Sequence, residues 1–249
     1  MLENKVIIYD DACPLCRLYT WWFVAWGFLK PGNRIGFGTA PPEVVDHVDL
    51  DRARHEIPLF DRETKATVYG LSALTLILGS RWTWLRPLFR SRAFHVCLYP
   101  LYQFITYNRR VIAGCRACCG FDCAPDLNRF WRSAFLVFVA VVYVLAIAAL
   151  AMNGAGEALV GVGLLLSLLI IGMLGAAITW RNRNKIANRD RPAGWNFLGN
   201  HATVVLIAAI GLVPIVLWPS LPAVISAGLL LILTAVVVEE LMRRRRTLA

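Results

Sequence analysis

The stretch KVIIYDDACPLCR, residues 5–17, decides what the N-terminal part of this chain can fold into. Its first five residues are mainly apolar and β-branched, so they predict a buried strand over residues 5–9. Pro14 suits the first turn of a helix, and the apolar, aromatic sequence after it predicts helix until Pro31. We therefore expect a strand, a turn and a helix in succession, with Cys13 at the N-terminus of the helix.

The sequence after this helix predicts a series of short strands and helices. The runs RIGFGT, IPLFD and ATVY read as strands, a helix is expected between the first two, and helical sequence follows the last. The predicted order of strand, helix, strand, helix, strand, strand and helix is that of a thioredoxin-like α/β fold. We place this domain, including a second group of cysteines at its end, over residues 1–128. Its later elements are expected at residues 34–39, 42–54, 57–61, 66–69 and 70–78.

The C-terminal half of the chain has the composition of a membrane protein. Hydrophobic residues make up 58% of the chain and charged residues 17%, with a mean hydropathy of +0.57, which is too apolar for an average soluble protein. Four apolar runs without Asp, Glu, Lys or Arg each approach the ~20 residues that a helix needs to cross a bilayer. We expect an all-α transmembrane domain of four helices over residues 129–249. The spans are predicted at about residues 134–152, 158–180, 202–218 and 221–238.

Basic residues between the spans predict the orientation of this membrane domain. Arginine or lysine residues flank the first span, fill the connection at 181–191 and follow the fourth span at 243–246, whereas the other two connections carry none. The positive-inside rule then predicts a multi-pass protein with both termini in the cytoplasm. The net charge of +10 is therefore read as a signal of topology. We expect the lipid bilayer as a partner and no nucleic acid.

Cys13 and Cys16 form a Cys-x-x-Cys pair at the predicted helix start, a context typical of a redox dithiol. Unpaired backbone N–H groups and the helix dipole favour an anion there, so the pKa of Cys13 is expected to be lowered. Cys16, one turn later, is placed to attack a mixed disulfide at Cys13. Asp10 is expected to cap the helix or to relay a proton, and Arg17 could add positive charge nearby.

The same spacing leaves other interpretations open. Cys-x-x-Cys can supply half of a zinc site, or the two residues can simply be packed thiols. A static disulfide is disfavoured, because the predicted cytoplasmic placement keeps thiols reduced. Dithiol exchange itself requires no cofactor, and its substrate would be a protein or small-molecule disulfide.

VIIYDDACPLCR resembles the opening of the DCC family of thiol–disulfide oxidoreductases. Asp10, Cys13 and Cys16 fall on the Asp-x-x-Cys-x-x-Cys pattern of that family, while Asp11 stands where the family usually has glycine. Later stretches at 68–74 and 102–114 also resemble segments of such domains. The resemblance implies a thioredoxin-like fold and dithiol exchange. With that fold, Pro58 would occupy the position before a strand where a cis-proline often faces the dithiol.

A second group of cysteines, Cys115, Cys118, Cys119 and Cys123, lies within CRACCGFDCAPDLN. Four thiolates at this spacing could hold zinc or an iron–sulfur cluster. Adjacent cysteines seldom both bind one ion, so these residues could instead form an auxiliary dithiol that exchanges electrons with the first pair. A third interpretation is that they have neither role. The competing function is therefore a metal-binding or regulatory membrane protein.

The predicted spans carry no cysteine and no charged residue, which argues against electron or ion transfer through them. Small residues spaced four apart, Gly163 with Ser167 and Gly172 with Ala176, favour close helix packing. We expect the membrane domain to serve as an anchor or assembly module, with homo-oligomers as one outcome and binding of a lipid-soluble molecule as the alternative.

Overall fold

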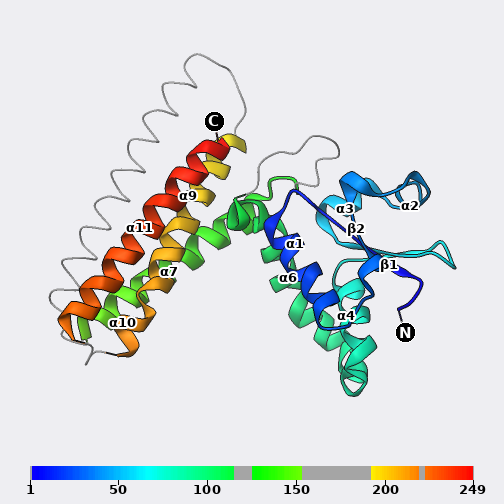
Figure 1. Cartoon of the computed structure of the whole chain (residues 1–249), viewed down its shortest axis with the longest axis horizontal. Coiled ribbons are helices and arrows are strands. Elements are labelled where there is room, and N and C mark those ends of the chain that lie inside the picture. The colour runs from blue at the N-terminus through cyan, green and yellow to red at the C-terminus, as the bar shows by residue number, and fades with distance from the viewer. Residues whose placement is uncertain (1, 115–124, 153–191, 219–221, 249) are drawn as a thin grey trace, which may run out of the picture. The chain divides into compact units, whose positions relative to one another are not determined.

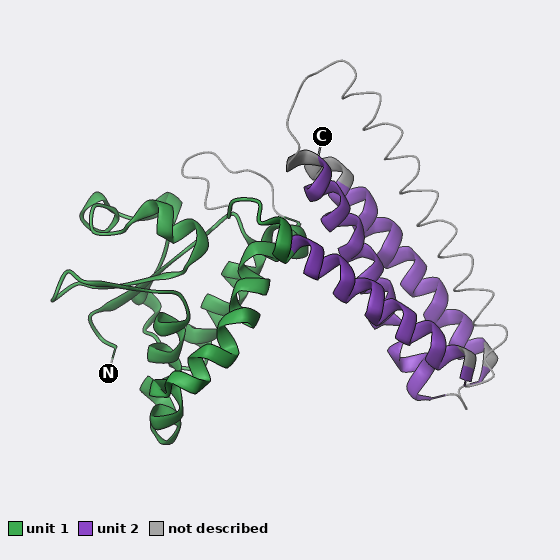
Figure 2. Cartoon of the chain, turned by 180° about the vertical axis from the view of Figure 1, so that it is seen from behind, with its two compact units in different colours: residues 1–131 green, residues 132–249 purple. Residues whose placement is uncertain are grey.

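The computed structural model divides the chain into two compact units, residues 1–131 and residues 132–249 (Figure 2). Unit 1 contains the sheet and the first cysteine pair, and unit 2 contains long apolar helices. The residues that the structure describes are 2–114, 125–152, 192–218 and 222–248.

Unit 1 contains a sheet with β1 and β2 side by side (Figure 1). Its four short strands have the order β2-β1-β3-β4. The central strand β1 runs parallel to β2 and antiparallel to β3, and β3 pairs antiparallel with β4. Ile7 lies opposite Leu59 in this register, which aligns the most apolar parts of the two central strands. The predicted strand at 5–9 is confirmed. The strands are β1 (Lys5–Tyr9), β2 (Arg34–Gly36), β3 (Pro58–Asp61) and β4 (Thr67–Tyr69).

Both faces of the sheet are buried, which is why β1 is apolar at consecutive positions. Because side chains alternate along a strand, Ile7 packs on one face and Ile8 on the other. The face with Ile7 is covered by α1 and α4, and the opposite face by the short helices α2 and α3. These helices are α1 (Pro14–Ala25), α2 (Pro42–Val45), α3 (Leu50–His55) and α4 (Gly70–Arg81).

Helix α1 ends before Pro31, earlier than the sequence predicts. Gly27 adopts a left-handed backbone with φ of 71°, and the N–H groups of Phe28 and Leu29 both donate to the carbonyl of Phe23, at 2.8 and 3.1 Å. A glycine takes this conformation without steric cost and closes the helix. The chain then passes through a 3₁₀ turn, η1 (Pro31–Asn33), directly into β2.

The second half of unit 1 is almost entirely helical. After α4 the chain forms a 3₁₀ turn, η3, a short helix α5, and the long helix α6, which contains Pro100 and ends at Gly114 with φ of 64°. Helix α6 packs against α1, α4 and α5. The bounds are η3 (Thr83–Leu85), α5 (Arg86–Arg90) and α6 (Arg92–Ala113).

Unit 2 consists of helices packed around a small apolar core. Leu150 of α7, Val204 of α9 and Leu233 of α11 belong to one buried cluster. Helix α9 approaches α11 closely, since a Cβ on Gly211 would collide with the side chain of Leu233. The helices are α7 (Arg129–Met152), which begins in unit 1, α9 (Pro192–Gly211), α10 (Val213–Leu217) and α11 (Ala223–Leu248).

Three helical stretches among the described residues are long and apolar enough to cross a membrane. They are Arg129–Leu150, Gly194–Leu217 and Val224–Arg244. Much of their apolar surface faces outward, because only 17%, 44% and 11% of the respective windows is buried. Exposed apolar surface of this extent is typical of a protein in contact with lipid, so the chain is membrane-associated.

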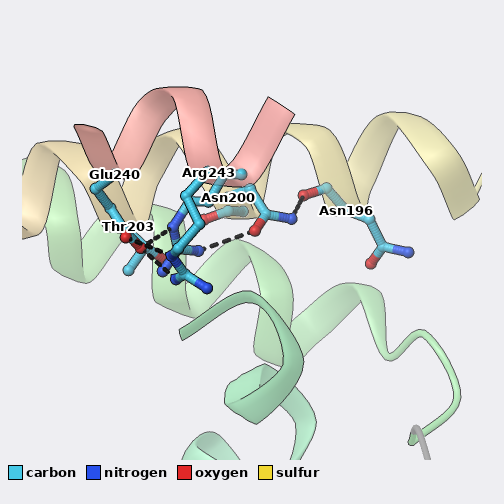
Figure 3. A network of polar contacts seen from close by, with 7 residues as sticks. Asn196, Asn200, Thr203, Glu240 and Arg243 are labelled. Carbon is cyan, nitrogen blue, oxygen red and sulfur yellow. Dashed lines mark hydrogen bonds and ion pairs between the residues drawn. The ribbon is translucent and has the colours of Figure 1, made fainter. Parts of the chain in front are cut away.

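A polar network joins α9 and α11 (Figure 3). Arg244 is only 3% exposed, and its guanidinium donates to Glu240 at 2.6 Å and to the side-chain oxygen of Asn200 at 2.9 Å. Arg243 donates twice to Glu240, at 2.7 and 2.6 Å. The amide of Asn200 in turn donates to the carbonyl of Asn196 at 2.8 Å.

The predicted fold class, a thioredoxin-like α/β domain followed by a four-helix transmembrane domain, is wrong. Helix dominates the described residues, and the sheet is limited to four strands of three to five residues. Two predicted elements are shorter or interrupted in the structure. The predicted strand RIGFGT forms β2 and then a 3₁₀ turn, η2 (Phe37–Thr39). The predicted helix at 42–54 forms two short helices, α2 and α3. Three apolar helices, not four, are present in the described residues, and the span predicted at 158–180 lies outside them.

Candidate functional site

Cys13 and Cys16 lie at the beginning of α1, directly after the turn that follows β1. Cys13 is the N-cap, with an extended backbone at φ of −92° and ψ of 114°, and Pro14 opens the helix. Its carbonyl already accepts the first helical hydrogen bond, from the N–H of Arg17 at 3.0 Å. Both cysteines are only 1% exposed. The sequence prediction for the position of this pair therefore agrees with the structure.

The two sulfurs interact with each other. No disulfide joins them, and Cys16 shares a hydrogen bond with Cys13. This hydrogen bond, followed by burial, raises the pKa of the Cys16 thiol. Cys16 is therefore the thiol of this pair that its surroundings hold in the protonated form.

A half-buried arginine from α6 faces this pair. Arg109 Nη1 lies 3.7 Å from Cys16 Sγ, and Nη2 donates to the carbonyl of Arg54 at 3.2 Å. Burial alone would lower the pKa of Arg109, but the charges of Cys16 and Tyr19, followed by Cys13, raise it. The guanidinium is thus a fixed positive charge that favours a thiolate at its sulfur neighbour.

Tyr19 contacts Cys16, and Tyr102 interacts with Tyr19. Burial, and next the charge of Cys16, raise the pKa of Tyr19, which also hydrogen-bonds Cys16 from one turn along α1. Tyr102 on α6 accepts a hydrogen bond from the N–H of Ile57 at 3.3 Å, and burial raises its pKa. Both phenols therefore stay neutral at physiological pH.

Asp10 lies in the turn and not at the helix cap. Its Oδ1 accepts a hydrogen bond from the N–H of Ala12 at 3.1 Å, whereas no side chain caps the N-terminus of α1. Burial raises the pKa of Asp10, and the charge of Arg109 opposes this effect. The capping role predicted for Asp10 is therefore absent, while a carboxyl whose pKa is raised by burial remains near the dithiol.

Asp11 explains why glycines stand at the last position of β2, Gly36, and two residues later, Gly38. Its Oδ2 accepts a hydrogen bond from the N–H of Gly38 at 3.2 Å. A Cβ at Gly36 would lie 2.9 Å from the Asp11 side chain, and one at Gly38 would lie 2.7 Å from Oδ2. The two glycines thus leave the space that Asp11 needs to hold the turn before Cys13.

Two other predicted site residues have different surroundings. Arg17 is exposed, and its carbonyl accepts a hydrogen bond from Arg34 at 3.1 Å. Pro58 is buried at the start of β3, and no peptide bond in the described part of the chain is cis. The cation that reaches the dithiol is thus Arg109 and not Arg17.

The second cysteine group, at 115, 118, 119 and 123, lies outside the described residues. Across the ranges that the structure does describe, no group of three His, Cys, Asp or Glu residues is placed to hold a metal ion. The zinc or iron–sulfur hypothesis for Cys115, Cys118, Cys119 and Cys123 stays a prediction.

Arg109 and Tyr19 were not predicted as site residues. Gln103, Thr106 and Arg109 are spaced three apart on α6, so they share one face of the helix. The first two are buried. This row of polar residues along one face of α6 is the sequence pattern that could have predicted a polar site on that face.

Comparisons of this chain with models of protein families, with curated proteins and with solved structures found no match.

Proposed function

We propose that the chain is a membrane-anchored thiol–disulfide oxidoreductase that uses Cys13 and Cys16. The observation that supports this best is the hydrogen-bonded sulfur pair at the start of α1, with the Arg109 guanidinium 3.7 Å from the second sulfur. The resemblance of residues 6–17 to the DCC family of oxidoreductases favours the same function.

The proposed exchange proceeds in two steps. The Cys13 thiolate attacks one sulfur of a substrate disulfide, the substrate S–S bond breaks, and the second substrate sulfur leaves as a thiolate that takes up a proton. Cys16 then attacks the Cys13 sulfur of the mixed disulfide and releases the remaining substrate thiolate. The substrate gains two electrons and two protons, and Cys13 and Cys16 become a disulfide.

The second step requires Cys16 to lose the proton that its surroundings hold in the resting state. Once Cys13 is in a mixed disulfide, it no longer accepts the hydrogen bond that raises the pKa of Cys16. Arg109 continues to stabilise the anion, so Cys16 becomes more acidic when it is needed. Asp10, a carboxyl whose pKa burial raises, is the proposed proton acceptor.

We further propose that the apolar helices anchor the dithiol domain as a multi-pass protein with both termini in the cytoplasm. The distribution of basic residues between the apolar stretches supports this orientation. Small-residue faces could also join copies of the chain, although the pairs Gly163 with Ser167 and Gly172 with Ala176 lie outside the described residues.

The test is disulfide exchange with oxidised glutathione by the full chain in detergent. Cys13→Ser should abolish exchange, and Cys16→Ser should accumulate a mixed disulfide with glutathione at Cys13, detected as added mass. Cys97→Ser is the matched control, because Cys97 is an exposed thiol on α6. If Cys13→Ser retained exchange, or if Cys97→Ser lost it equally, the proposed function would be wrong.

A further inference from the structure

Helix α6 buries several polar side chains and exposes several large apolar ones. Its polar residues Gln103, Thr106 and Asn108 are buried, Asn108 completely. Its large apolar residues are exposed instead: Val96 is 63% exposed and Leu101 is 54% exposed. A helix in contact with water normally turns its polar face outward, so the outer face of α6 is suited to an apolar or interfacial environment.

Exposed aromatic residues lie beside the helices that α6 contacts. Trp22 and Trp26 stack on α1 with ring centroids 4.6 Å apart, and both are exposed. Trp82 packs edge-on against Phe28 at 5.1 Å, which places η3 next to the end of α1. Trp82 immediately precedes η3, and Trp84 within η3 is 76% exposed. Tryptophan is the residue that membrane–water interfaces most favour.

The charges around these aromatic residues have one sign. Between Glu63 and Asp122 the sequence contains no Asp or Glu. Three arginines within that interval are exposed. They are Arg81 at the end of α4, Arg90 at the end of α5 and Arg92 at the start of α6. This segment of the chain therefore combines exposed tryptophan side chains with positive charge and contains no acidic residue, a composition that complements anionic headgroups.

A hollow in the same part of unit 1 could accept a headgroup phosphate. It lies between α4 and α5, has a volume of about 200 Å³, and is lined by residues that include Ser80, Arg86 and Arg90. Arg86 is held in place by a hydrogen bond from Nε to the carbonyl of Gly79 at 2.8 Å.

We propose that this aromatic–basic face, formed by Trp22, Trp26, Trp82, Trp84, Arg90 and Arg92, docks onto the headgroup region of an anionic bilayer. The partner is lipid and not a second protein, because charge of one sign and exposed tryptophan occur together in a chain that also has helices long and apolar enough to cross a membrane. Docking would be a second membrane contact, separate from the spans. It does not depend on the thiol chemistry.

The experiment is hydrogen–deuterium exchange of the full chain, one copy per nanodisc. Peptides covering residues 81–105 should exchange about fivefold more slowly in discs rich in phosphatidylglycerol than in phosphatidylcholine discs. The double variant Arg90→Glu with Arg92→Glu should lose this protection. The matched control is Arg62→Glu with Lys65→Glu, which reverses two exposed charges on the turn between β3 and β4 and should retain it.

Tryptophan fluorescence gives a second readout that does not require a charge reversal. Lipids brominated near the headgroup should quench part of the emission, and Trp84→Phe should reduce the quenchable share. Equal exchange in both lipids, an equal effect of the control variant, or quenching unchanged by Trp84→Phe would overturn the proposal. Protection that appears only with two or more copies per disc would show that a second copy, and not lipid, covers the face.

Discussion

Each unit of the protein holds an arginine side chain among polar partners, and the two arginines differ in what they contact. Arg244 in unit 2 is buried against the carboxylate of Glu240 and the amide oxygen of Asn200. Arg109 in unit 1 is half-buried and contacts the sulfur of Cys16. A carboxylate keeps its charge near neutral pH, whereas a thiol changes charge with protonation and redox state.

This difference separates a structural contact from a reactive one. The network around Arg244 joins α9 to α11 and has the same charges before and after any reaction (Figure 3). The contact between Arg109 and Cys16 becomes stronger when Cys16 is ionised and weaker when the sulfur is neutral or in a disulfide. The first arrangement can only stabilise the helices, while the second can change the reduction potential of the dithiol.

The largest expected effect is a loss of stability when Arg244 no longer has its carboxylate partner. Glu240→Ala would leave a buried guanidinium without its carboxylate, and we expect the free energy of unfolding to fall by about 3 kcal/mol. The measurement is unfolding of the full chain in mixed micelles by titration with a denaturing detergent. Glu239→Ala is the control, because Glu239 is exposed on the same turn. Equal losses in both variants would show that the network is not a stabilising contact.

The reactive arginine should affect redox chemistry more than stability. Arg109→Met removes a positive charge that favours the thiolate form, so the reduced dithiol becomes less stable relative to the disulfide. We expect the reduction potential of Cys13 and Cys16 to become more negative by about 30 mV. Equilibration with glutathione buffers, read by thiol alkylation, measures the shift. Arg110→Met removes the neighbouring charge on α6 and should leave the potential nearly unchanged; a shift in the opposite direction would contradict the proposed contact.

An effect of comparable size is expected from the turn that precedes Cys13. In Gly38→Ala the new Cβ would approach Asp11 Oδ2 to 2.7 Å, so Asp11 must move and its hydrogen bond to the Gly38 N–H is weakened. We expect a loss of about 1–2 kcal/mol in thermal or chemical unfolding. Gly32→Ala is the matched control, since nothing lies within 4 Å of a Cβ there. A neutral Gly38→Ala would mean that Asp11 does not hold the turn.

The smallest expected effect is a change in the pH dependence of stability. Because burial raises the pKa of Asp10 above its ordinary value of 3.8, the folded state binds this proton more tightly than the unfolded state. The contribution of Asp10 to the stability of the wild type therefore falls as the pH rises from about 3.8 through the folded pKa. Asp10→Asn should remove this fall, so that the variant is the more stable protein above that window and equal to wild type below it.

The measurement for Asp10→Asn is chemical unfolding of both proteins from acidic to neutral pH. Asp46→Asn, at an exposed position of unit 1, is the comparison variant and should follow the wild-type curve. A variant that loses stability with rising pH as steeply as wild type would show that Asp10 does not carry the effect.

Local sequence was sufficient to predict β1, the start of α1 and the position of Cys13, because each depends on neighbouring residues. It was less successful at the ends of elements. Gly27, and not Pro31, closes α1, and the stretch at 34–39 forms only three residues of strand. Short strands depend on pairing with partners elsewhere in the chain, so local propensity alone overestimates their length.

The chain by itself determined that two thiols stand at a helix start and that long apolar helices follow, because β-branched runs, proline and hydrophobic length act over a few residues or one helix. Only the tertiary structure decided which charge meets those thiols. Arg109 is 93 positions from Cys16 in sequence, and the packing of α6 against α1 brings its guanidinium to that sulfur. Electrostatic contacts depend on distance in space, which no local pattern specifies.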